Sequence, residues 1–254
     1  MTARFGPVER LAVLSDVHAN VPALEAVLAE PDVAAADLVV FCGDLTWGPE
    51  PARTADLVRA LGPRAVFVRG NADRAVVELA AGTRPAATPR EAWMLGLHPA
   101  PVVEFLAGFH FTVVVDVTGL GAVRCCHGSP RADTELVTPA TPAARLAALS
   151  ADVPERILVG GHTHLQFDRR AGDLRSVNPG SVGLPYHDST PGTAYWALLG
   201  PDVALRRTRY DVAAAIAATV AAGDPKADVI TGLLTAPPSV AELTADAERL
   251  EFSD

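Results

Sequence analysis

Hydrophobic residues along the first part of the chain form short runs that each end in polar residues. Residues 10–15 (RLAVLS), 37–42 (DLVVFC) and 65–70 (AVFVRG) are such runs, and a continuous apolar run bounded by turn residues is typical of a buried strand. Between them, residues 20–28 and 52–61 have apolar positions at helical spacing. Strands that alternate with helices in this way predict parallel βαβ units.

The second part of the chain has a different pattern. Residues 83–108 are rich in proline and contain two short helical patterns without a strand. Strand patterns then follow at 109–117, 121–128, 156–161, 166–177, 193–199 and 203–210. The last three are joined by turns, which favours antiparallel pairing. We therefore expect an α/β fold with mixed sheets in one domain over residues 1–254, with a helical insertion at about 83–108 and a helical C-terminal tail at about 211–254.

The net charge of the chain limits the kinds of partner that it is expected to bind. The 254 residues carry a formal net charge of −9, which argues against attraction to long nucleic acid or to an anionic membrane. A small phosphorylated ligand is still compatible with this net charge, because the local charge at a binding site can differ in sign from the net charge of the chain. Lys226 is the single lysine beside twenty arginines; we attribute this to codon bias, so the arginines do not by themselves indicate phosphate binding.

Cysteine usage and the N-terminal sequence favour a cytoplasmic protein. The chain has three cysteines, and its first residues lack the pattern of a signal peptide. No apolar stretch approaches the roughly 18–20 residues of a membrane helix. We expect reduced, buried thiols at Cys125 and Cys126.

Side chains that can bind a metal follow nearly every predicted strand. In chain order they are Asp16, His18, Asp44, Asn71, Asp73, His127, His162 and His164. In open α/β sheets, ligands bind beyond the carboxyl ends of the strands. His162 and His164 would also point to the same side of an extended segment. Each piece taken alone is common in turns, but the joint pattern predicts a metal site.

These motifs carry a family resemblance. The order D-x-H, G-D-x-x-x-G, G-N-x-D, a histidine and G-H-x-H resembles the calcineurin-like metallophosphoesterase superfamily over roughly residues 10–210. The segment NPGSVGLP at 178–185 is similar to its smaller bacterial branch, which includes phosphodiesterases and diadenosine-tetraphosphatase-like proteins. The resemblance implies a four-layer αββα sandwich, with two mixed sheets flanked by helices.

The resemblance also implies a ligand set for two divalent transition metal ions. Asp16, His18 and His164 would bind the first ion. Asn71, His127 and His162 would bind the second ion, and Asp44 would bridge both. Mixed imidazole and oxygen ligands suit Mn²⁺, which we favour, and also Fe, Zn or Ni.

Catalysis would then centre on Asp44, Asn71 and His127, with a metal-bound hydroxide attacking phosphorus. We expect a phosphodiesterase that acts on a small or nucleotide-like phosphorylated substrate. The alternatives are a phosphomonoesterase and a non-catalytic scaffold, as in the retromer subunit that shares this fold. The oligomeric state stays open.

One position departs from the family pattern. Many members have histidine third in the G-N-H-D motif, where it protonates the leaving group, and this chain has Ala72. General acid catalysis is worth about 10²–10⁴ in rate. Either the substrate has a good leaving group, or another residue, with His187 as the candidate, supplies the proton. Asp73 would then be a structural acid.

Other residues of chemical interest have a simpler structural interpretation. Trp47 offers a face for stacking a nucleobase, although packing is favoured. Arg74 and Arg131 follow metal motifs and are weak candidates for phosphate contacts. We expect structural roles for Trp93, Met94, His98 and His110. The insertion at 83–108 is a candidate cap over the metals.

Overall fold

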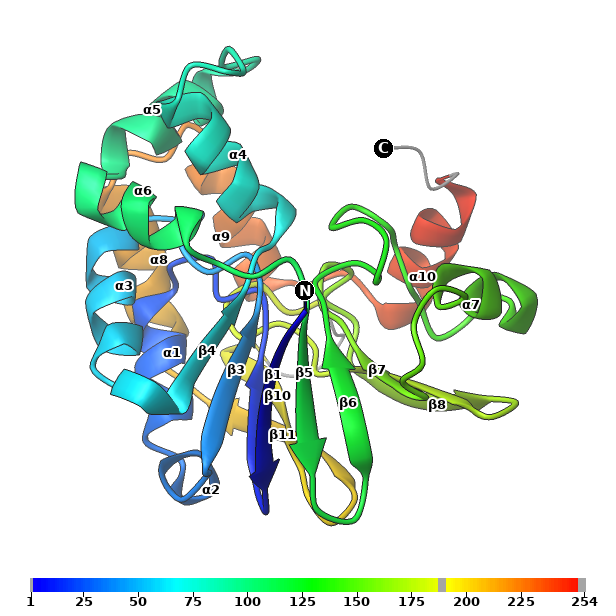
Figure 1. Cartoon of the computed structure of the whole chain (residues 1–254). Helices are drawn as coiled ribbons and strands as arrows, with labels where there is room; N and C mark the ends of the chain where they lie inside the picture. The colour runs from blue at the N-terminus through cyan, green and yellow to red at the C-terminus, as the bar shows by residue number, and fades with distance from the viewer. Residues whose placement is uncertain (1, 187–190, 251–254) are drawn as a thin grey trace.

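The computed structural model describes residues 2–186 and 191–250, and it has two mixed β-sheets packed face to face with helices on both outer faces (Figure 1). This is the four-layer αββα arrangement that the motifs implied, and that prediction is confirmed. In Figure 1, α1 and α3 lie on one side of the paired sheets, and α7 and α10 lie on the other side.

The five-stranded sheet contains the predicted βαβ units. Its order is β11 (Val203–Arg209), β10 (Thr193–Leu199), β2 (Leu11–Leu14), β3 (Leu38–Cys42) and β4 (Ala65–Val68). Strands β2, β3 and β4 are parallel, while β10 pairs antiparallel with both β2 and β11. The three parallel strands therefore end at the same edge of the sheet.

The six-stranded sheet has a strand that the hydrophobic pattern did not predict. Its order is β1 (Ala3–Val8), β5 (Val113–Val117), β6 (Gly121–Cys125), β7 (Ile157–Val159), β9 (Leu174–Asn178) and β8 (Phe167–Ala171). Strand β1 lies at the edge, is interrupted by Gly6 and Pro7, and exposes part of most residues. It therefore lacks the apolar run of a buried strand. The strand expected at 109–117 begins only at Val113.

Valine side chains from both sheets fill the space between them. Val13, Val40 and Val66 come from the five-stranded sheet, and Val115 and Val123 come from the six-stranded sheet. Each is at most 5% exposed. Complete burial of such a side chain contributes about 1.5–3 kcal/mol, so this layer holds the two sheets together.

Amphipathic helices cover the outer faces. The helices are α1 (Val21–Leu28), α2 (Pro31–Ala34), α3 (Pro51–Arg59), α4 (Asn71–Ala80), α5 (Pro89–Leu97), α6 (Ala100–Ala107), α7 (Ala143–Leu149), α8 (Val212–Ala221), α9 (Ala227–Thr235) and α10 (Val240–Arg249). The side chain of Asn20 caps α1 by accepting a hydrogen bond from the amide of Ala23 at 3.2 Å. Leu24 and Val27 of α1 pack on the five-stranded sheet, and Leu146 of α7 packs on the six-stranded sheet.

The insertion and the tail occupy different places around this sandwich. Helices α5 and α6 of the insertion pack on α4 through Met94 and Leu106, and they form the upper lobe in Figure 1. Helices α8 and α9 lie behind this lobe, whereas α10 lies near α7 at the other side. Among the described residues, no helix has the length and apolar character needed to cross a membrane.

Candidate metal centre

The loops that follow β2, β3, β4, β6 and β7 bring all seven predicted ligands to one edge of the two sheets. Six of them form two groups in which the ligand atoms lie within 4.8 Å of one another. The groups are Asp16, His18 and His164, and Asp44, His127 and His162. We call them the first and the second triad. The seventh residue, Asn71, contacts the second triad.

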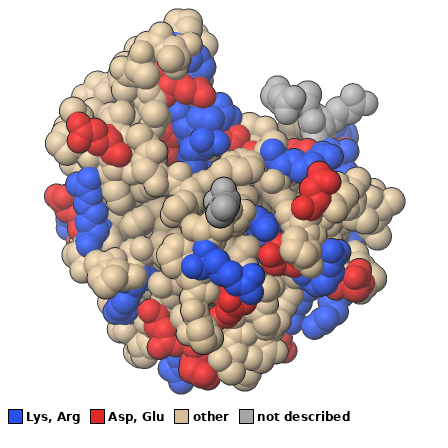
Figure 2. All heavy atoms as spheres, viewed as in Figure 1, with Lys and Arg blue, Asp and Glu red and all other residues tan. Residues whose placement is uncertain are grey.

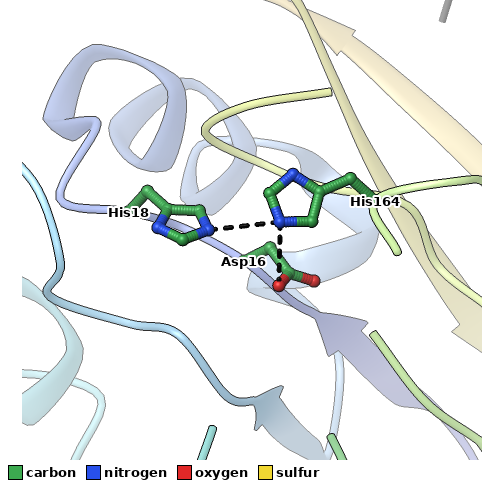
Figure 3. Close-up of side chains that lie close together, drawn as sticks. All are labelled: Asp16, His18 and His164. Carbon is green, nitrogen blue, oxygen red and sulfur yellow. Dashed lines mark hydrogen bonds and ion pairs between the residues drawn. The ribbon is translucent and has the colours of Figure 1, made fainter. Parts of the chain in front are cut away.

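In the first triad, three ligand atoms converge (Figure 3). His164 Nε2 lies 3.2 Å from Asp16 Oδ1 and 3.2 Å from His18 Nε2. Asp16 is fully buried, and its Oδ2 accepts the backbone N–H of His162 at 3.1 Å. Its Oδ1 accepts no hydrogen bond from any residue that the structure describes. An unsatisfied buried carboxylate oxygen is costly, and a cation at this point would satisfy it.

In the second triad, Asp44 lies between the two groups. Its Oδ1 is 3.5 Å from His127 Nε2, and its Oδ2 is 3.8 Å from His18 Nε2. Asn71 Oδ1 lies 3.0 Å from the same nitrogen of His127. Because one carboxylate oxygen faces each triad, the geometry fits the bridging role predicted for Asp44.

Backbone carbonyl groups fix the tautomer of all four histidines. The pairs are His18 Nδ1 with Trp47 O at 3.2 Å, His127 Nδ1 with Cys42 O at 2.7 Å, His162 Nε2 with Thr134 O at 3.1 Å and His164 Nδ1 with Leu184 O at 2.6 Å. A carbonyl oxygen only accepts, so the paired nitrogen carries the proton and the other nitrogen presents its lone pair. Partners of this kind orient metal-binding histidines. The donor set therefore fits divalent cations.

Most of the predicted ligands have a left-handed backbone conformation. Among the described residues, six non-glycine residues have φ between 49° and 65°. They are Asp16, His18, Ala19, Asp44, His162 and His164. Such left-handed conformations cost about 1–3 kcal/mol each and concentrate at functional sites. Five of the six are predicted ligands, so this backbone strain is located at the centre itself.

Two motif positions require glycine because side chains of neighbouring loops lie too close for a Cβ atom. Gly43 has φ +91°, and a Cβ atom there would collide with Nδ1 of His127. A Cβ atom on Gly70 would collide with the carboxylate of Asp44. The glycines before Asp44 and Asn71 therefore leave room for the ligands of the neighbouring loops.

Asp73 supports the loop of Asp44 without facing the triads. Its carboxylate accepts the amides of Asp44 at 2.9 Å, Leu45 at 3.0 Å and Gly70 at 2.9 Å. Burial, with the charge of Asp44 as a second cause, raises the pKa of Asp73 to about 7. This geometry agrees with the structural role expected for Asp73 in the absence of a histidine at position 72.

The neighbouring carboxylates divide the four imidazoles into two groups with pKa values shifted in opposite directions. Burial, and next the neighbouring His164 or His127, lowers the pKa of His18 and of His162 to about 4. Burial also acts to lower the pKa of His127 and of His164, but the nearby carboxylates of Asp44 and Asp16 outweigh it, so both pKa values are raised. At neutral pH, His18 and His162 are therefore unprotonated and able to bind a cation.

The arginines near the motifs are already paired. Arg74 donates two hydrogen bonds to Asp133, at 2.8 and 2.9 Å. Arg131 forms an ion pair with Glu135. Neither guanidinium is therefore a free phosphate contact in this structure. His187, the candidate proton donor, lies outside the described residues.

The remaining residues of chemical interest contact the protein. His98 is buried between the carbonyl oxygen of Met94 at 2.8 Å and the hydroxyl of Thr46 at 3.0 Å. The ring of His110 packs edge-on against Phe5. The three cysteines are free and buried. Trp47 packs beside the buried cluster of Met94.

A cavity of about 970 Å³ opens over the two triads. Its wall includes two features that sequence reasoning missed. Tyr186 stacks on His164, with ring centroids 4.6 Å apart, and α9 of the C-terminal tail lies at the far side. Neither had a local signal, because Tyr186 follows the recognised motif and α9 has the pattern of an ordinary helix.

One family model matches this chain, and several solved structures are similar to it. The family model described as the calcineurin-like phosphoesterase superfamily domain matches residues 10–199. A metallophosphoesterase from Sphaerobacter thermophilus is 27% identical, with a TM-score of 0.71 over 88% of this chain and 98% of its own. No curated protein matches the sequence.

Two further solved structures share the fold at lower identity. A hypothetical protein from Pyrococcus horikoshii OT3 is 18% identical, with a TM-score of 0.76 over 91% of this chain and 99% of its own. A provisionally named diadenosine tetraphosphatase is also 18% identical, with a TM-score of 0.54 over 82% of this chain and 97% of its own. At this identity the similarity concerns the fold.

Proposed function

This chain belongs to the calcineurin-like phosphoesterase superfamily, and from this premise we propose that it is a metal-dependent phosphodiesterase acting on a small or nucleotide-like substrate. The observation that carries the proposal is the pair of adjoining triads, whose imidazole nitrogens and carboxylate oxygens converge. We propose two divalent cations as cofactors, with Mn²⁺ favoured and Fe, Zn or Ni compatible with the same donors.

Bound divalent cations supply Lewis acidity for a phosphoryl oxygen and lower the pKa of water. The chain's own residues would hold and orient them. Asp16, His18 and His164 would hold one cation, and His127, His162 and Asn71 would hold the other, with Asp44 as the ligand shared by both. The carbonyl partners orient each imidazole ring and favour the tautomer whose other nitrogen can bind a cation.

Two arguments support a diester over a monoester as the substrate in this proposal. A terminal monoester carries two negative charges near neutral pH, whereas a diester carries one. Arg74, which borders the cavity next to Asn71, is already neutralised by Asp133. The methyl group of Ala72 cannot protonate a leaving group, so the substrate should have a leaving group of low pKa.

The test compares two chromogenic substrates. Protein purified without chelators is first analysed for bound metal, and rates are then measured with added Mn²⁺ on bis(p-nitrophenyl) phosphate and p-nitrophenyl phosphate. We expect about two metal ions per chain and faster hydrolysis of the diester. Faster hydrolysis of the monoester would favour a phosphomonoesterase. Bound metal without hydrolysis of either substrate would favour the scaffold alternative.

A further inference from the structure

One face of α9 looks into the cavity above the triads. Lys226, Val229, Ile230 and Leu233 all border this cavity. Their spacing of three, four and seven residues places them on one side of a helix. The helix therefore presents a mixed face, with one cation followed by aliphatic side chains, toward the space in front of the metal centre.

This face is only partly used for packing. Ile230 and Leu234 are buried against Ala215 of α8. Val229, in contrast, is 55% exposed and is one of three large apolar side chains that are exposed in the described part of the chain. An exposed apolar residue on a cavity wall is available to a ligand, because its contact with water is lost when the ligand binds.

The basic side chains on the same wall differ in whether they are free to attract an anion. Arg74, Arg84 and Arg90 border the cavity but each forms an ion pair with a nearby carboxylate. Lys226 forms no ion pair with any described residue. Figure 2 shows blue side chains on the flank of the upper lobe where it borders the hollow in the surface.

Two side-chain contacts fix α9 relative to the insertion. Arg90 at the start of α5 donates to both carboxylate oxygens of Asp224, at 2.9 and 2.8 Å. Asp224 is buried, and it lies in the turn between α8 and α9. Trp93 Nε1 donates to the carbonyl oxygen of Ala222 at 3.0 Å. The insertion and the tail therefore form a single outer wall, which we call the α5–α9 wall.

We propose that the α5–α9 wall is the specificity site of this protein, where Val229 and Leu233 contact the apolar face of a nucleoside-sized group attached to the reacting phosphoryl group. The inference rests on the proposed function. The cavity of about 970 Å³ lies at the upper end of the roughly 300–1,000 Å³ of typical ligand sites, so a phosphoryl group alone leaves most of it empty. Lys226 lies at the same wall and attracts an anionic ligand.

The experiment compares ligands that differ only in the group the wall would contact. Binding of thymidine 5′-monophosphate and of methyl phosphate to the Mn²⁺-loaded protein is measured by calorimetry. Hydrolysis of p-nitrophenyl thymidine 5′-phosphate and of methyl p-nitrophenyl phosphate, which share a leaving group, is measured in parallel. The variants are Val229→Ser and, as the matched control, Val220→Ser, because Val220 is 59% exposed on α8 and does not border the cavity.

We expect the natural sequence to prefer the thymidine ligand, and Val229→Ser to reduce that preference about three- to ten-fold, since Ser loses methyl groups that the ligand would cover. Val220→Ser should keep the preference. Equal binding of the two ligands, or the same preference in Val229→Ser, overturns the proposal. If thymidine binding weakens as expected but neither diester is cleaved, the wall is supported and the proposed function fails.

Discussion

The metal centre and the α5–α9 wall border the same cavity but are built in different ways. Five of the seven predicted ligands of the centre have left-handed backbone, and its four imidazoles are each held by a backbone carbonyl group. The wall consists of regular helices that are joined by one ion pair and one indole hydrogen bond. The comparison indicates that the backbone conformation of the centre costs conformational energy and is fixed. The exposed side chains of the wall, in contrast, can be replaced with little loss of stability.

The two regions also differ in their relation to the family. The loops of the centre lie within residues 10–199, which the family model matches, and α8 and α9 follow this range. A substitution at the centre should therefore remove the chemistry, whereas a substitution at the wall should leave the chemistry in place and change substrate preference or stability. Three substitutions test this division, in order of decreasing effect.

The first substitution is Asp44→Asn at the centre. Removing the negative charge between the triads should reduce turnover by about 10³-fold or more, since loss of a single electrostatic group from an active site already costs about 10²–10³-fold. Initial rates at saturating Mn²⁺ measure this. Asp173→Asn, at a side chain that is 82% exposed, is the control and should keep the full rate. Full activity in Asp44→Asn would refute the bridging role.

The second substitution is Asp73→Asn, at a residue that is not a predicted ligand but holds the loop of the ligand Asp44. An amide cannot accept three backbone N–H groups as a carboxylate does, so the loop of Asp44 should be held less firmly. Changes at such supporting residues typically cost 10–100-fold in metal affinity. Competition with a fluorescent chelator measures the affinity. Unchanged affinity would mean that the Asp44 loop keeps its conformation without Asp73.

The third substitution is Asp224→Asn in the wall. It weakens charge-assisted hydrogen bonds to Arg90, so the free energy of unfolding should fall by about 1–2 kcal/mol, as measured by urea denaturation. Asp116→Asn is the matched control, because Asp116 also accepts two bonds from an arginine, Arg4, at an exposed position. That change should cost less than about 1 kcal/mol. Equal losses in the two variants would show that the buried Arg90–Asp224 pair stabilises the protein no more than the exposed Arg4–Asp116 pair does.

The sequence predicted the α/β fold class and the candidate ligand positions because both depend on local patterns. Strands β2, β3 and β4 are continuous apolar runs, and parallel strands place their carboxyl ends at one edge. Asp16, Asp44 and Asn71 follow these ends directly. The edge strand β1 was missed because a partly exposed strand with Gly6 and Pro7 has no such pattern.

The amino-acid sequence by itself determined which side chains are candidates for the centre, because each follows its strand by two to five residues. Only the tertiary structure decided how they meet. His18 and His164 are 146 residues apart and their Nε2 atoms lie at 3.2 Å, and their tautomers depend on carbonyl groups of separate loops. The α5–α9 wall likewise joins residues 134 positions apart. Contacts of that range arise from packing of the whole chain, which no local pattern encodes.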